Sequence, residues 1–184
     1  MIKRLFLIIT VFSVLSTPII VYSSANSIKI NKIPNILESQ IKSYFPTCRP
    51  VQLSDFDKGL QEYLSGTPRS INPGYIAADF NGDGKEDYAV LLICDNKNNP
   101  NIIFTVFMAV KDDSYSCINV HTWTGTLYLK NLYLDIVKPS KIKEHDSKQL
   151  ITIKNYSVLL VLFEAASQVY YWKDGKFNHI QISD

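Results

Sequence analysis

The stretch that decides the fold reads YIAADFNGDGKEDYAVLLIC and spans residues 75–94. Two runs of apolar, aromatic and β-branched residues flank a polar centre made of Asp, Asn, Gly, Lys and Glu. Such runs are typical of strands, and such a break is typical of a tight loop. The sequence therefore predicts two strands, 75–80 and 88–94, which a nine-residue loop at 79–87 joins.

The loop carries oxygen-bearing side chains at its positions one, three, five and nine, and glycine at position six. Ca²⁺ takes six to eight oxygen ligands, and alternate side chains of a tight loop can turn inward to supply them. We predict a calcium site whose ligands are the side chains of Asp79, Asn81, Asp83 and Asp87 and the backbone carbonyl of Lys85. Mg²⁺ fits less well because it demands tighter octahedral geometry. The alternative is a polar hairpin turn that binds no ion.

The residues between the predicted ligands have their own expected places. Gly84 should allow the sharp bend, Phe80 should point into the core, and Glu86 should point into solvent. An EF-hand loop would have a glutamate at position twelve, and Val90 stands there instead. Both flanks lack helical periodicity, so the site is predicted to be strand–loop–strand.

This pattern resembles the calcium loops of FG-GAP and VCBS repeats, which occur in integrin-like propellers and bacterial surface proteins. The matching residues are 79–84 (DFNGDG) and 87–90 (DYAV). A propeller repeats its signature in every blade, whereas this chain contains the loop once, so a full propeller is excluded. The wider layout resembles small exported bacterial proteins of unknown function with a single such loop. That resemblance would cover roughly residues 34–184 and implies no activity.

Outside the loop, short strand-like runs follow one another to the end of the chain. The predicted strands are 102–110, 115–122, 126–134, 149–153, 157–163, 169–172 and 177–182. Asp174-Gly175 is a two-residue hairpin signal, and Lys111–Ser114 and Asn155–Tyr156 are further predicted turns. So many strands favour an α+β fold that is mainly antiparallel β, with a curled or two-layer sheet.

One or two short helices are expected before the strands. Residues 35–45 place apolar side chains at helical spacing between Pro34 and Pro46. A weaker helix should begin at Ser54, where Ser54 and Asp57 resemble a capping pair, and continue through Leu64. Residues 65–74, rich in Gly, Pro, Ser and Thr, read as a loop.

Residues 1–25 have the parts of a secretory signal peptide. Lys3 and Arg4 precede an apolar run to Tyr22, and small residues precede a predicted cleavage after Ala25. The alternative, an uncleaved membrane anchor, is weakened by Pro18 and nearby hydroxyl residues. Cleavage would leave residues 26–184 as a single periplasmic or secreted domain with no membrane span.

This mature domain is formally neutral, with 17 basic and 17 acidic side chains. No sequence window clusters lysine and arginine, which argues against nucleic acid and anionic lipid as partners. The three cysteines, Cys48, Cys94 and Cys117, allow one disulfide and leave the pairing open, and buried unbonded thiols are the alternative. Without a C-x-x-C spacing or paired histidines, zinc is disfavoured.

For function, we expect a calcium-stabilised, non-enzymatic binding or interaction protein whose partner is a protein or cell-envelope ligand. An inhibitor or immunity-type protein that binds an exported enzyme is an alternative. An extracytoplasmic hydrolase is a weaker one, because His121, the 144–146 segment (Glu-His-Asp) and Glu164 lie in no catalytic motif. We therefore predict no catalytic residues.

Overall fold

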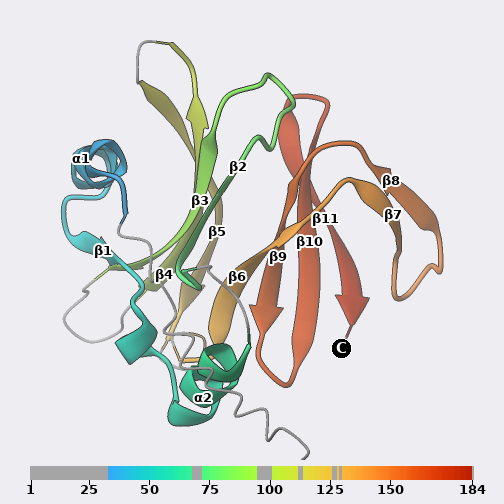
Figure 1. The fold of residues 1–184 in the computed structure, drawn as a ribbon, viewed down its shortest axis with the longest axis horizontal. Coiled ribbons are helices and arrows are strands. Elements are labelled where there is room, and N and C mark those ends of the chain that lie inside the picture. The colour runs from blue at the N-terminus through green and yellow to red at the C-terminus, as the bar shows by residue number, and fades with distance from the viewer. Residues whose placement is uncertain are drawn as a thin grey trace, which may run out of the picture.

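The computed structural model describes residues 33–67, 72–94, 101–111, 114–125, 128 and 130–183. The predicted signal peptide and its cleavage site lie outside these residues. The described part is an α+β fold that is mainly antiparallel β, as predicted (Figure 1). Its helices are α1 (Asn35–Tyr44), the 3₁₀ turn η1 (Leu53–Asp55) and α2 (Lys58–Gly66). Its strands are β1 (Cys48–Pro50), β2 (Tyr75–Ala78), β3 (Asp87–Cys94), β4 (Asn101–Ala109), β5 (Tyr115–Thr124), β6 (Leu132–Val137), β7 (Ser140–Lys143), β8 (Leu150–Ile153), β9 (Ser157–Leu162), β10 (Ala166–Lys173) and β11 (Lys176–Ser183).

The strands form two packed sheets and a separate hairpin. The first sheet has the order β1-β3-β4-β5, and β2 also pairs with β3. The second sheet has the order β11-β10-β9-β6, and β7 pairs with β8. All pairings are antiparallel. Figure 1 shows α1 on one side of the first sheet and the β7–β8 hairpin beyond the second, so the molecule is built in layers.

Strand β3 is the centre of the first sheet, and all eight of its residues are buried. Its odd-numbered side chains, such as Leu91, join the main core between the two sheets. Its even-numbered side chains, such as Val90, pack with Leu37 and Ile41 of α1 on the other face. Burial on both faces explains why residues 88–94 of this strand are continuously apolar rather than alternating.

Two short strands share one edge of β3. β2 pairs with residues 87–90 and β1 with residues 92–94, while Leu91 lies between them. The Leu91 carbonyl accepts a hydrogen bond from Val51 N at 2.9 Å, and Leu91 N donates to the Gly74 carbonyl at 2.8 Å. The chain thus leaves this edge at Val51 and returns to it at Gly74, with η1 and α2 in between.

A disulfide joins Cys48 of β1 to Cys94 of β3, which face each other across the strand pair. This selects one of the three pairings that the sequence left open, and Cys117 remains a free, half-buried thiol. Burial raises the pKa of Cys117, and the Thr105 hydroxyl, 3.1 Å from its Sγ, opposes that shift.

Several predicted elements are confirmed with small changes in their bounds. The β10–β11 turn is Asp174-Gly175, with φ angles of 53° and 76° and Lys173 paired with Lys176, as a type I′ hairpin requires. The helix at 35–45 is α1, and its buried side chains are Leu37 and Ile41.

Other expectations about elements were wrong. The strand predicted at 126–134 begins at Leu132 and ends at Val137. The second helix does not begin at Ser54, because Asp55 accepts a hydrogen bond from Gln52 N and ends a separate 3₁₀ turn there. Asp57 instead occupies the N-cap of α2. The turn predicted at Asn155–Tyr156 is a bend between β8 and β9, since the hairpin turn lies at 145–147.

Candidate metal-binding loop

The predicted loop lies between β2 and β3, and the pairing of Ala78 with Asp87 closes it at its base. Strands rather than helices flank it, as predicted for a strand–loop–strand site. Val90, at position twelve, is fully buried in β3, and its apolar side chain offers no oxygen to a metal ion. The observed architecture is therefore not that of an EF-hand.

Asp79 is the organising residue of the loop. Its Oδ1 accepts hydrogen bonds from Gly82 N at 2.7 Å and from Asp83 N at 3.2 Å, and its Oδ2 accepts one from Gly84 N at 2.8 Å. The chain can wrap around one carboxylate in this way because Gly82 and Gly84 have φ angles of +81° and +82°. A single side chain thus sets the loop's curvature.

Asn81 and Asp83 make shorter-range contacts of the same kind. Asn81 Oδ1 accepts a hydrogen bond from Asp83 N, and Asp83 Oδ1 accepts one from Lys85 N, both at 2.9 Å. Asp83 is exposed and Asn81 is half-buried. These bonds orient an amide oxygen and a carboxylate within the same turn of chain that surrounds Asp79.

Asp87 is fully buried, and its two oxygens tie the loop to the sheet. Oδ2 accepts a hydrogen bond from Phe80 N and Oδ1 accepts one from Ala109 N, both at 2.9 Å. Burial raises the pKa of Asp87, the two N–H donors oppose this, and the negative charges of Asp83 and Asp79 add to the rise. Asp87 therefore lies close enough to both carboxylates to feel their charge, while it anchors the end of β4.

The residues between the predicted ligands take the expected places. Phe80 is fully buried in the main core, with its ring centroid 6.4 Å from that of Phe177. Glu86 is exposed and accepts a hydrogen bond from the Tyr88 hydroxyl at 2.6 Å. The Lys85 ammonium turns away from the loop and donates to the carbonyl of Val110.

Asn155, which sequence reasoning missed, holds the loop from outside. It lies at the bend between β8 and β9, and its Nδ2 donates to the Phe80 carbonyl at 3.3 Å. Its side chain also lies against Gly82, where an added Cβ would come within 2.9 Å of Asn155 Oδ1. No local pattern could have marked this residue, since 75 positions separate it from Phe80.

The donor set of the loop suits a hard cation. Every predicted side-chain ligand offers oxygen, and each carboxylate oxygen has lone pairs for more than one partner. Asp79 and Asp87 already use both oxygens on backbone N–H groups. In the described part of the chain, no group of three or more His, Cys, Asp or Glu side chains is arranged to hold a metal ion. The calcium site therefore stays a prediction.

The residues considered for catalysis are dispersed over separate elements. His121 is exposed on β5, with its ring centroid 4.3 Å from that of Trp123. His145 lies in the β7–β8 turn, where its Nδ1 is 3.2 Å from Asp146 Oδ1. Glu164 lies in the β9–β10 turn with a φ of 58°. No shared cleft brings these three described segments together.

A groove of about 780 Å³ lies between α1, β1, η1 and α2. Its wall includes Ile41, Val51 and Leu53 together with the polar side chains of Glu38 and Gln61. Arg49, also on this wall, forms a bidentate ion pair with Asp55 at 2.7 Å. The groove contains none of the residues considered for catalysis.

No model of a known protein family, no curated protein and no solved structure matches the chain. Among the described residues, no helix is long and apolar enough to cross a membrane.

Proposed function

We propose that the chain is an exported, non-enzymatic binding protein whose loop at 79–87 takes one Ca²⁺. The arrangement of Asp79 carries this proposal, because three successive loop N–H groups converge on its carboxylate while Asn81 and Asp83 supply oxygens beside it. Calcium would hold β2 and β3 together at this loop. Binding free energy would then add directly to the free energy of unfolding.

Electrostatic repulsion within the loop supports a cation there. Asp79, Asp83 and Asp87 belong to one nine-residue segment. Burial is the main cause that raises the pKa of Asp87, and the negative charges of Asp83 and Asp79 add smaller contributions. Repulsion among these carboxylates opposes their placement in one short segment, whereas a divalent cation would turn that repulsion into attraction.

The proposed export is supported by the disulfide. Cys48 and Cys94 are paired in the fold, and disulfides persist in oxidising compartments such as the periplasm and the extracellular space. The N-terminal residues 1–25, with their basic start and apolar run, fit the same destination. A binding role fits the dispersal of the candidate catalytic residues.

Thermal unfolding in calcium and in chelator tests the calcium proposal. At a calcium concentration 100 times the Kd, stabilisation should be about 2.7 kcal/mol. For a domain of this size that corresponds to a rise in Tm of about 5–10 °C. Asp83→Asn should abolish most of this rise, since it removes a charged ligand.

Glu86→Gln is the matched control, because Glu86 lies within the loop but its side chain faces solvent and Tyr88. It removes one negative charge and should leave the calcium-dependent rise in Tm intact. Equal Tm values in calcium and in chelator for the unmodified protein would refute the site. So would an equal loss of the rise in both variants, which would indicate a nonspecific charge effect.

A further inference from the structure

The β7–β8 hairpin is a two-sided element with unlike faces. Ile142 pairs with Ile151, and both pack with the buried Ile153 against the second sheet. Side chains alternate between the faces of a strand pair, so the neighbouring pairs must face the other way. These outward pairs are Lys141 with Thr152 and Lys143 with Leu150.

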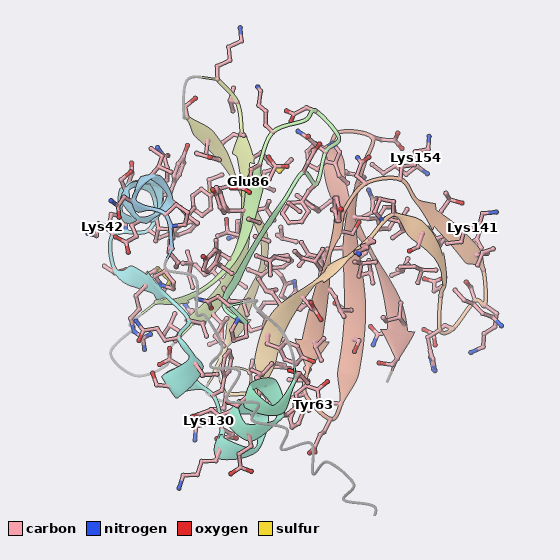
Figure 2. The ribbon with its side chains drawn as sticks, in the orientation of Figure 1. Lys42, Tyr63, Glu86, Lys130, Lys141 and Lys154 are labelled. Carbon is pink, nitrogen blue, oxygen red and sulfur yellow. A yellow bond between two sulfur atoms is a disulfide. The ribbon has the colours of Figure 1, made fainter. Side chains whose placement is uncertain are left out.

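Lysines dominate this outer face and the exposed residues that flank β8. We call this surface the lysine face and define it as the outward strand residues Lys141, Lys143, Leu150 and Thr152 together with the flanking residues Lys148 and Lys154. All six side chains are exposed. Lys148 lies just before β8 and Lys154 directly follows it. Figure 2 shows Lys141 and Lys154 on the hairpin side of the molecule and Lys42 on the opposite side, near α1. The sequence alone does not show this face, because Glu144 and Asp146 interrupt the lysines along the chain.

The charge of the lysine face is unbalanced. Residues 138–154 contain five lysines and two acidic residues, whereas the mature chain as a whole has 17 of each sign. The remainder of the mature chain is therefore net acidic. Within the described residues, none of the four lysines of the face forms an ion pair, in contrast to Arg49 with Asp55 and Lys130 with Asp57. Such a face is complementary to an anionic surface.

Leu150, which pairs with Lys143 at the turn end of the hairpin, adds an apolar group beside these charges. It is 58% exposed, more than any other large apolar side chain in the described part of the chain. A soluble polyanion offers lysines phosphate or carboxylate groups but gives an exposed leucine nothing to bury against. A lipid bilayer offers both, because an apolar side chain can enter the headgroup layer while lysines remain at the phosphates.

We propose that the lysine face binds the surface of a lipid bilayer rich in anionic headgroups. Lys141, Lys143, Lys148 and Lys154 contact the headgroup phosphates, and Leu150 inserts between the headgroups. This names a partner for the proposed binding role and rests on that role, but it does not require calcium. In this orientation the second sheet lies between the bilayer surface and the rest of the molecule.

Sedimentation with vesicles of phosphatidylcholine, with and without phosphatidylglycerol, tests the proposal in the presence of chelator. The protein should bind only the anionic vesicles. Raising the salt from about 0.1 M to about 1 M shortens the screening length from about 10 Å to about 3 Å and should release it. Each lysine near an anionic surface contributes about fivefold to binding, so K141Q/K143Q should weaken it about thirtyfold.

K42Q/K58Q is the matched control, since it removes the same charge from exposed positions outside the hairpin. It should change binding by less than about twofold, and an unchanged Tm in both double variants would show that the fold is intact. If both double variants weaken binding equally, or if the unmodified protein ignores anionic vesicles at low salt, the proposal is wrong.

Leu150→Ser separates a bilayer from a soluble polyanion. It should weaken vesicle binding at least about fivefold, because the inserted side chain is lost. Binding that survives L150S unchanged and is displaced by polyphosphate would overturn the bilayer assignment. Repeating the Tm comparison in calcium and chelator on the same samples keeps the two proposals apart, because a missing calcium response leaves the vesicle result standing.

Discussion

Gly82 and Gly84 have nearly the same backbone conformation, with φ angles of +81° and +82°, but different surroundings. A Cβ on Gly84 would meet nothing within 4 Å, whereas a Cβ on Gly82 would lie 2.9 Å from Asn155 Oδ1. The two positions therefore separate backbone strain from steric conflict. Strain alone in this region costs about 1 kcal/mol for a residue with a side chain.

We expect Gly84→Ala to lower the free energy of unfolding by about 1 kcal/mol and Gly82→Ala by about 2–3 kcal/mol. The larger loss arises because Asn155 must move and give up its hydrogen bond to the Phe80 carbonyl. Urea unfolding in chelator measures both values. In the Asn155→Ala background the two glycine substitutions should cost the same, and a difference that persists would contradict this account of the contact.

At the scale of single elements, the 3₁₀ turn η1 depends on one carboxylate. Asp55 accepts two hydrogen bonds from the Arg49 guanidinium and one from Gln52 N, each at 2.7 Å. The hydrogen bond from Arg49 lowers the pKa of Asp55 most strongly, desolvation opposes it, and the Gln52 N–H lowers it further. The net shift is downward from 3.8, so the folded state favours the ionised form.

This shift predicts a stability that depends on pH. The contribution of Asp55 should be complete above the unfolded pKa of about 4 and should be lost as the pH falls through the lower folded pKa. Urea unfolding between about pH 2 and pH 7 should show a shallower acid limb for Asp55→Asn than for the unmodified protein. Asp174→Asn, in the β10–β11 turn, is the control. If the acid limbs of both variants match that of the unmodified protein, Asp55 does not stabilise the fold in this way.

Elements with a local signal could be predicted from sequence, and elements that depend on distant contacts could not. Asp174-Gly175 specifies the β10–β11 turn by itself, because both residues accept positive φ. β7 was missed because only Ile142 among its four residues is apolar, and its strand form depends on pairing with β8.

The candidate loop shows the same division. Its residue types and spacing predicted a strand–loop–strand unit with Phe80 buried, and the structure agrees. The spacing of the loop residues could not show that both oxygens of Asp87 accept hydrogen bonds from backbone N–H groups, because one of those groups belongs to Ala109 on β4. Nor could the sequence pattern show that the Asn155 side chain contacts Gly82, because only the folded molecule brings the bend between β8 and β9 to the loop.

At the scale of the whole molecule, burial is concentrated on one strand. Every residue of β3 is buried, and β3 pairs with β4 on one edge and with β1 and β2 on the other. The β7–β8 hairpin is the opposite case. Among the described residues its two strands pair only with each other, and most of their side chains are exposed. Local opening is easiest where few apolar contacts must be broken.

Native-state hydrogen exchange should therefore rank these elements. We expect the amides of β3 to exchange only through global unfolding. Those of β7 and β8 should exchange through local opening, which has a lower free energy. Mass spectrometry of peptides from deuterated protein would measure both. Equal protection of β3 and the hairpin would mean that the layers unfold as one cooperative unit, contrary to this expectation.

The shared edge of β3 has a consequence for how the chain tolerates change. The segment that carries η1 and α2 departs at Val51 and rejoins at Gly74, and both ends are hydrogen-bonded to the same residue, Leu91. Its two ends are thus fixed side by side whatever lies between them. We expect residues inserted in this segment to leave the strand register unchanged, provided that its buried side chains, such as Leu60, still pack in the main core. This is the place where a grafted peptide or a second domain could be spliced in without unpairing the sheet.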